Sequence, residues 1–269
     1  MEKKYRKVLK MKQAIYRTLI ELTNGRMTSS ILYKFARSKM SRFLIKPFSK
    51  TYRINEDEIK GDLDQFHTLH EFFIRLLKED ARPIHQGEDT IVSPVDAMIE
   101  DIGMVDSKHV ITVKEKDYSI AEMLGGVEEA EKYKGGTYMI FYLSPSHYHR
   151  IHSPVDGQVK RQWTLGKKSY PVNKWGLTLG KDTLSKNYRK ISEIQYDGGE
   201  LAMVKVGAMF VNSIERTYQN DSLKKGEEVA YFSFGSTVIL LFQKDAFQLV
   251  PTIQFPAPIK VGEVIGHIV

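Results

Sequence analysis

The chain has 269 residues, of which 42% are hydrophobic and 27% charged, a composition typical of a globular protein with one catalytic domain and an appendage. It has no cysteine, which excludes disulfides, thiolate zinc sites, iron–sulfur clusters and cysteine nucleophiles. The net charge of +7 is uneven, because residues 1–53, the basic arm, contain 15 Lys and Arg but only two Glu. Such an arm indicates a polyanionic partner, either a nucleic acid or an anionic membrane surface.

The basic arm predicts two amphipathic helices. Apolar residues recur at spacings of three and four from Val8 to Leu22 and again from Leu32 to Phe43, and the second helix is expected to end near Pro47. The helices either pack on the domain or lie in the headgroup plane of a membrane. We favour the membrane, because the arm lacks the aromatic and basic pattern of a nucleic-acid-binding module. No stretch is long and apolar enough to span a bilayer, and no signal peptide is expected.

The rest of the chain predicts an α+β fold with a β-rich core. Residues 54–88 are interpreted as a helical bridge with one apolar face, and residues 89–269 as the catalytic core. A helix is expected in the core only around Ile120 to Tyr133. The expected strands are Ile91 to Val105, Tyr138 to Leu143, Gly157 to Trp163, Leu201 to Val211, Val238 to Phe242 and Val264 to Val269.

Two short sequences occur twice in the core. Ser93-Pro94-Val95-Asp96 returns as Ser153-Pro154-Val155-Asp156, and Lys225-Gly226-Glu227-Glu228-Val229 resembles Val261-Gly262-Glu263-Val264. In each case a turn-forming group precedes a predicted strand. The repeats indicate a β core of two similar strand–turn halves, although short turn motifs also recur by chance.

A cluster of histidines follows the predicted strand Tyr138 to Leu143. His147, His149 and His152 lie within six positions, at a strand end where catalytic groups are often placed. The cluster is open to three interpretations: a metal site, an acid–base site, or an ordinary surface group of histidines.

Two further motifs carry groups suited to catalysis. Gly235-Ser236-Thr237 stands directly before the apolar run Val238 to Phe242, and the glycine gives the backbone freedom to hold the serine hydroxyl against its own preceding carbonyl. Asp96 and Asp156 each follow Pro-Val at a strand entry, where an aspartate either caps a turn or orients a histidine. The residues alone do not choose between these roles.

The order of these motifs resembles that of the phosphatidylserine decarboxylases, which are pyruvoyl-dependent enzymes. The resemblance extends over roughly residues 65–245. Ala97 and Phe234 stand where glycine and leucine are usual in the family, and neither change removes a reacting group. The matching motifs are Phe72-Phe73-Ile74-Arg75-Leu76-Leu77-Lys78, Arg82-Pro83-Ile84, Ser93-Pro94-Val95-Asp96, Tyr148-His149-Arg150-Ile151-His152-Ser153-Pro154 with Gly157, Val206-Gly207-Ala208 and Gly235-Ser236-Thr237-Val238.

The resemblance implies that Asp96, His152 and Ser236 act together in self-cleavage. His152 would deprotonate Ser236 while Asp96 orients the imidazole, and the hydroxyl would attack the carbonyl of Gly235. The peptide bond becomes an ester, and elimination and hydrolysis then leave a pyruvoyl group. The products are a β chain of residues 1–235 and an α chain of residues 236–269.

The resemblance also implies the cofactor and the reaction. The pyruvoyl group derived from Ser236 would form a Schiff base with the amine of phosphatidylserine and accept the electrons left by carbon dioxide. The product would be phosphatidylethanolamine. His149 is the candidate that returns a proton to the carbanion.

The expected partners are phosphatidylserine in an anionic membrane surface, at the cytoplasmic face of the cell membrane, and the two chains of the same precursor. No nucleic acid or metal is expected, and a homo-oligomer is left open.

One alternative is a metal-dependent hydrolase ligated by His147, His149 and His152, with Asp96 as a further ligand. Another is a carrier protein, but Lys205 lies inside an apolar alternation and is unsuited to an exposed hairpin tip. A membrane scaffold would leave the serine, histidine and aspartate motifs unexplained.

Overall fold

The computed structural model describes residues 26–113, 116–167, 170, 172, 182–208, 213–233 and 236–269, with the backbone alone for residues 26–29 and 236. The first predicted arm helix, Val8 to Leu22, therefore lies outside the described residues. No helix within these ranges combines the length and apolar character needed to cross a membrane. The helices are α2 (Arg26–Ala36), α3 (Ile45–Tyr52), α4 (Leu69–Phe73), α5 (Ile120–Leu124), α6 (Val127–Glu131) and α8 (Thr183–Lys186), and the 3-10 helices are η1 (Lys39–Leu44), η2 (Glu56–Glu58) and η3 (Leu63–Gln65).

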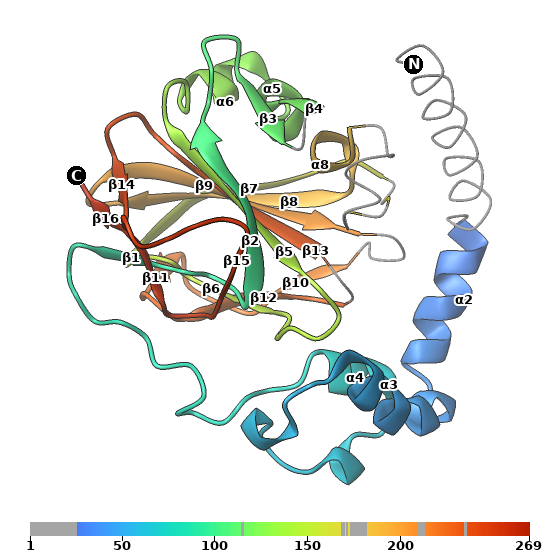
Figure 1. The fold of residues 1–269 in the computed structure, drawn as a ribbon. Coiled ribbons are helices and arrows are strands. Elements are labelled where there is room, and N and C mark those ends of the chain that lie inside the picture. The colour runs from blue at the N-terminus through green and yellow to red at the C-terminus, as the bar shows by residue number, and fades with distance from the viewer. Residues whose placement is uncertain are drawn as a thin grey trace, which may run out of the picture.

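An antiparallel eight-stranded sheet, ordered β11-β7-β8-β9-β13-β5-β2-β15, forms the centre of the β-rich part (Figure 1). Two three-stranded sheets, β1-β16-β14 and β10-β12-β6, and the hairpin β3-β4 accompany it. The strands are β1 (Thr90–Val92), β2 (Ala97–Met104), β3 (Val110–Val113), β4 (Lys116–Ser119), β5 (Thr137–Leu143), β6 (Arg150–His152), β7 (Gly157–Leu165), β8 (Arg189–Tyr196), β9 (Gly199–Gly207), β10 (Ile214–Arg216), β11 (Ser222–Leu223), β12 (Glu228–Phe232), β13 (Ser236–Phe242), β14 (Phe247–Leu249), β15 (Ala257–Ile259) and β16 (Val264–Ile268).

The central strands of the large sheet are buried on both faces. Val238 and Leu240 of β13 pack in one hydrophobic core with residues of the two three-stranded sheets. Ile239 and Leu241, which alternate with them, pack in a second core with residues of α5, α6, α8 and the β3-β4 hairpin. The continuous apolar sequence from Val238 to Phe242 is therefore explained by burial on both sides.

The predicted strands of the core are confirmed within the described residues. The predicted strand from Ile91 to Val105 is divided into β1 and β2 by the turn at residues 93–96. The helix predicted around Ile120 to Tyr133 forms as α5 and α6, but the expectation of no other helix in the core is wrong, because α8 forms as well. Helices α5 and α6 are separated at Gly125, whose φ of 96° lies in the left-handed region that glycine tolerates.

The N-terminal helices differ from the prediction. The expected second helix of the arm is interrupted after Ala36, and Pro47 does not end a helix but lies in the first turn of α3. Proline is tolerated there, because the first turn has no intrahelical acceptor for its missing N–H. Of the predicted apolar face, Ala36 is buried, whereas Met40 and Phe43 of η1 are 73% and 68% exposed.

The bridge of residues 54–88 is mostly non-helical, in contrast to the prediction. Helix α4 ends at Phe73, and the chain then runs antiparallel to an earlier part of the same segment, with Ile59 opposite Leu77. This pairing takes the place of the expected helix, and Leu76 turns out to be 44% exposed. The local apolar pattern predicted a helix because it contains no information about this pairing partner.

Candidate active site

Ser236, the predicted nucleophile, is the first residue of β13. It lies opposite Leu143 of β5 on one side and opposite Gly207 of β9 on the other. Gly235, which contributes the other half of the predicted cleavage bond, lies outside the described residues. The predicted start of the α chain is therefore a strand position inside the largest sheet.

The three predicted histidines follow β5 and come back toward the strand that leads into Ser236. A turn closes with a hydrogen bond from the His147 N–H to the Ser144 carbonyl, at 3.0 Å. The chain then pairs with β12, and the Phe232 N–H donates to the His149 carbonyl at 3.0 Å. β12 ends at Phe232, shortly before Ser236. The histidine motif therefore pairs with the strand that precedes the Gly-Ser-Thr motif, although the two motifs are far apart in the sequence.

His149 is fully buried, and its ring packs on that of Phe73 at a centroid distance of 4.0 Å. Its Nδ1 donates to the His147 carbonyl at 2.8 Å, which fixes Nδ1 as the protonated nitrogen. Its Nε2 has no hydrogen-bond partner in the described structure. Burial, followed by the nearby charge of Arg75, lowers the pKa of His149 well below its usual value. The imidazole is therefore neutral near pH 7, with a free lone pair on Nε2.

Arg75 approaches the same place from the end of α4. Its Nη2 donates to the Ser146 carbonyl at 3.1 Å and to the His147 carbonyl at 3.2 Å, so Arg75 and His149 share the His147 oxygen as acceptor. The side chain is only 4% exposed, and burial lowers its pKa to about 10. Its Nε and Nη1 are buried without a hydrogen-bond partner. The sequence signal for this residue was a charge inside the apolar run Phe72 to Leu77.

His152 has a partner for each of its ring nitrogens. Its Nδ1 donates to the Gly226 carbonyl at 2.8 Å, and its Nε2, left as the acceptor in the neutral ring, lies 3.3 Å from the Tyr148 hydroxyl. Burial lowers the pKa of His152. The imidazole therefore presents an unprotonated Nε2, which suits proton abstraction.

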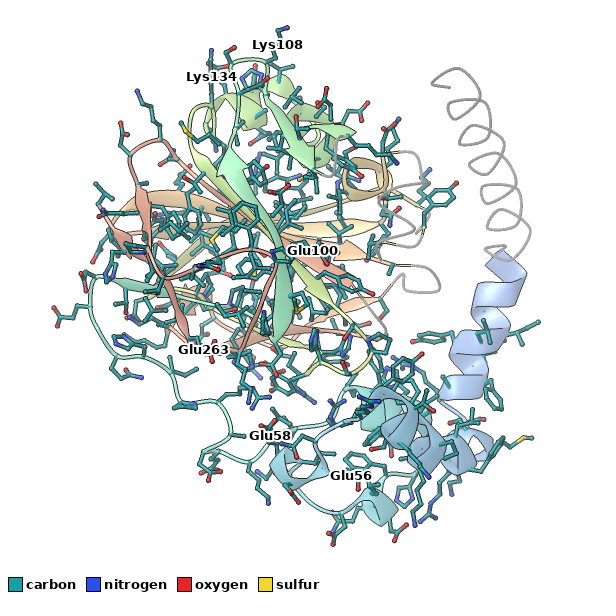
Figure 2. The ribbon with its side chains drawn as sticks, viewed as in Figure 1. Glu56, Glu58, Glu100, Lys108, Lys134 and Glu263 are labelled. Carbon is teal, nitrogen blue, oxygen red and sulfur yellow. The ribbon has the colours of Figure 1, made fainter. Side chains whose placement is uncertain are left out.

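Asp96 is buried and held by Arg82. The Arg82 Nε lies 2.8 Å from Oδ1 and the Nη2 lies 2.5 Å from Oδ2, while the Val261 N–H donates to Oδ1 at 2.9 Å. Arg82 also donates to Glu58, on the N-terminal segment beside the β-rich part, at 2.8 Å (Figure 2). Asp96 and His152 are not hydrogen-bonded to each other in the described structure. The Asp96 charge is nevertheless close enough to oppose the lowering of the His152 pKa.

Two other predicted candidates have local structural partners. Asp156 is exposed and accepts the Lys225 N–H at 3.2 Å, as a turn residue does. The Nδ1 of His147 accepts the Ser144 N–H at 3.0 Å. Among the described residues, no three His, Asp or Glu side chains are grouped as metal ligands.

Comparison with known proteins places the chain in a family. The family model described as phosphatidylserine decarboxylase matches residues 69–267, which include Asp96, His149, His152 and Ser236. The chain belongs to the phosphatidylserine decarboxylase family. It is 54% identical over 254 residues to the phosphatidylserine decarboxylase proenzyme of Geobacillus sp. (strain WCH70), with 94% of this chain and 98% of that protein covered. It is 55% identical over 254 residues to the proenzyme of the same name from Anoxybacillus flavithermus, with 94% and 96% covered.

Proposed function

We propose that the chain cleaves itself between Gly235 and Ser236 and that the residues around Ser236 then carry out decarboxylation. Membership of the family makes the chain a phosphatidylserine decarboxylase, a pyruvoyl-dependent lyase of phospholipid biosynthesis that converts phosphatidylserine to phosphatidylethanolamine. The observation that carries the proposed site is the register of β13. β13 begins at Ser236, the proposed first residue of the α chain, and β12, which pairs with the strand of His152, ends at Phe232 shortly before it.

The surroundings of Ser236 fit a pyruvoyl group at a new chain end. After cleavage, β13 would remain paired with β5 and β9, both of which belong to the β chain of residues 1–235. The new terminus is therefore kept in place by two strands, without needing its former peptide bond. A covalent cofactor formed there would have a fixed position relative to the His149 segment.

In the proposed self-cleavage, His152 Nε2 takes the proton of the Ser236 hydroxyl, and the oxygen attacks the carbonyl carbon of Gly235. The carbon–nitrogen bond breaks and an ester forms. Removal of the α proton of residue 236 breaks the bond between its Cβ and the ester oxygen, which leaves with Gly235 as a carboxylate. The dehydroalanine that remains is converted by water to the pyruvoyl group with release of ammonia. The imidazolium form of His152 is favoured by the hydrogen bond to the Gly226 carbonyl, then by the charge of Glu228 and, after it, by that of Asp96.

In the proposed decarboxylation, a pyruvoyl group at residue 236 would supply a ketone able to take up the substrate amine and to accept the electron pair left by carbon dioxide. His149 transfers a proton between the substrate amine and the reacting carbon. Because burial keeps this imidazole neutral, its Nε2 first takes a proton from the substrate ammonium. The same nitrogen then donates that proton to the carbon that has lost carbon dioxide.

We also propose that the core is built from two similar halves. In each Ser-Pro-Val-Asp turn, the serine hydroxyl donates to the valine carbonyl two residues on, at 2.8 and 2.7 Å. The two turns also exchange backbone hydrogen bonds: the Val92 N–H donates to the Pro154 carbonyl at 3.0 Å, and the His152 N–H donates to the Pro94 carbonyl at 2.8 Å. This correspondence favours duplication over chance recurrence of a turn motif.

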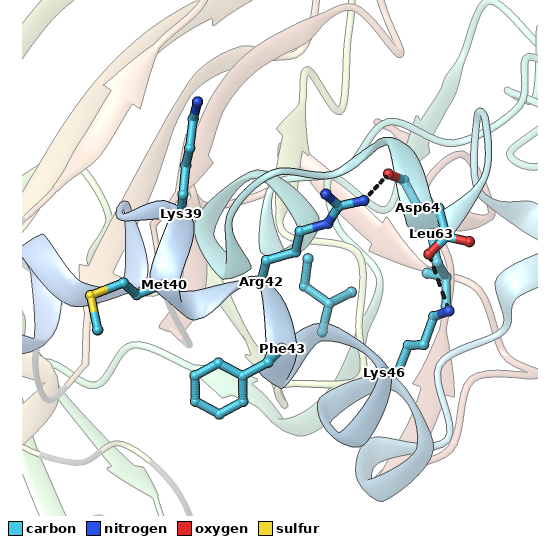
Figure 3. Close-up of a pocket in the computed structure, with 8 residues that line it drawn as sticks. Lys39, Met40, Arg42, Phe43, Lys46, Leu63 and Asp64 are labelled. Carbon is cyan, nitrogen blue, oxygen red and sulfur yellow. Dashed lines mark hydrogen bonds and ion pairs between the residues drawn. The ribbon is translucent and has the colours of Figure 1, made fainter.

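A peripheral position at the cytoplasmic face of the membrane is part of the proposal, and the surface of the N-terminal helices supports contact with a membrane. A hollow of about 530 Å³ lies beside η1, and exposed apolar and basic side chains border it (Figure 3). Asp64, the acidic residue that lines the hollow, forms an ion pair with Lys46, with Nζ 3.1 Å from Oδ1. Exposed cations beside exposed apolar side chains suit an anionic lipid surface, where each cation contributes about 1 kcal/mol. The hollow is lined by Lys39, Met40, Arg42, Phe43, Ile45, Lys46, Leu63 and Asp64.

The mass of the purified protein tests the cleavage. The unmodified chain should give two pieces that divide between residues 235 and 236, and the Ser236→Ala chain should remain whole. Ser233→Ala is the matched control, because Ser233 is a buried serine near the bond and should not affect its cleavage. A fully active preparation that consists of one uncleaved chain would contradict the proposal.

A further inference from the structure

We propose that Arg75 binds the phosphodiester of the substrate headgroup. The inference rests on the proposed active site around Ser236 and His149, and it assigns a binding role to a residue outside the cleavage triad. It is carried by polar atoms that are buried beside His149 and have no partner in the described structure.

The guanidinium of Arg75 is only partly satisfied. Nη2 is held by the carbonyls of Ser146 and His147, but Nε and Nη1 make no hydrogen bond although they are buried. Leaving buried donors unpaired is costly, and more so when they carry charge. Unpaired donors on a buried cation call for an anionic acceptor such as a phosphate or a carboxylate. Nε and Nη1 point to different sides of the guanidinium, so each would donate separately to such an acceptor.

The phosphodiester is the better of the two anions in phosphatidylserine. A cation on the carboxylate would stabilise the charged ground state more than the departing neutral carbon dioxide, and would therefore slow decarboxylation. The phosphodiester keeps its charge throughout the reaction. An arginine that binds it anchors the headgroup without opposing the loss of carbon dioxide.

The position of Arg75 relative to His149 fits this assignment. Both side chains donate to the His147 carbonyl, so the guanidinium and the imidazole are neighbours. In the substrate, only the serine Cβ and the ester oxygen separate the phosphorus from the reacting carbon. A phosphodiester on Arg75 therefore places the reacting carbon near the unpartnered Nε2 of His149. Its charge also offsets that of Arg75, which contributes to the lowered pKa of His149.

The test is calorimetric titration of the mature enzyme with glycerophosphoethanolamine, which has the phosphodiester and amine but no carboxylate, and with serine, which has the carboxylate but no phosphate. Arg75→Lys should weaken binding of glycerophosphoethanolamine about tenfold and Arg75→Gln about a hundredfold, while serine binding stays unchanged. Arg189→Lys is the matched control. Arg189 is also 4% exposed, but its donors are bonded to the carbonyls of Glu122, Met123 and Asn187.

Two results would overturn the assignment: unchanged glycerophosphoethanolamine binding in both Arg75 variants, or a loss confined to serine, which would make the carboxylate the partner. If neither variant matures, the unsubstituted enzyme decides, since glycerophosphoethanolamine should bind at least tenfold more tightly than ethanolamine. Equal binding of these two ligands would refute the phosphodiester site. Intact-mass measurement of every sample keeps failure of cleavage separate from failure of this inference.

Discussion

Replacing Lys205 with methionine should stabilise the folded chain, by an amount that depends on pH. Lys205 lies in β9, is 2% exposed, and donates from Nζ to the Ser192 hydroxyl at 2.7 Å. Burial, followed by the charge of Lys190, lowers its pKa from 10.5 to about 7. Methionine has a similar length and no charge to bury, so it should fill the same space.

The size of the effect follows from the two pKa values. The unfolded chain binds a proton on Lys205 up to about pH 10.5, whereas the folded chain releases it near pH 7. Folding therefore carries a penalty of about 4 kcal/mol at pH 7, which shrinks as the pH rises and disappears above the unfolded pKa. The lost hydrogen bond to Ser192 costs about 1 kcal/mol. We therefore expect Lys205→Met to raise the free energy of unfolding by about 3 kcal/mol at pH 7.

Urea denaturation of the Ser236→Ala chain, with and without Lys205→Met, is the suitable assay, because an uncleaved chain unfolds as one molecule. The difference in the free energy of unfolding between the methionine and lysine chains should fall by about 3 kcal/mol between pH 7 and pH 9.5. Lys108→Met, at an exposed lysine (Figure 2), is the control and should show no such change. A Lys205→Met chain that is less stable at both pH values, or whose advantage does not vary with pH, would refute the reasoning.

Two more variants test the proposed roles. His149→Ala should still be cleaved into two chains, as judged by mass, but should lose at least a hundredfold in decarboxylation rate, and normal turnover would exclude the proton-transfer role. Met40→Asp with Phe43→Asp should weaken binding to anionic phosphatidylglycerol vesicles at least tenfold in a sedimentation assay. Met104→Asp is the control, because Met104 is 69% exposed but lies on β2. Equal loss of vesicle binding in this control would show that the effect is not specific to η1.

The central strands could be predicted from the sequence because their environment is uniform. Val238 to Phe242 is buried on both faces, so every residue in the run is apolar and the pattern points to one structure. Lys205 was interpreted as unsuited to an exposed tip, and it is indeed buried in β9. The helical bridge was wrong beyond Phe73, because the pairing of Ile59 with Leu77 depends on chain geometry that local periodicity does not encode.

The site was predictable as a set of residue types but not as a set of contacts. Serine, histidine and aspartate motifs mark groups that do chemistry, and the resemblance named Asp96, His152 and Ser236. The clamp of Arg82 on Asp96 and the unpaired donors of Arg75 could not be predicted, because both arise where the N-terminal segment meets the core. A charge within the apolar run from Phe72 to Leu77 was the one available sign of Arg75, and it gave no indication of a partner.

The place of β13 within the sheet has a consequence for refolding. In the proposed cleavage before Ser236, β13 loses its link to residue 235 but keeps its pairing with β5 and β9, so the sheet would have to form before the chain is cut. The uncleaved precursor would refold as a single molecule. The two chains of the proposed mature enzyme would first have to associate, so their refolding would slow on dilution.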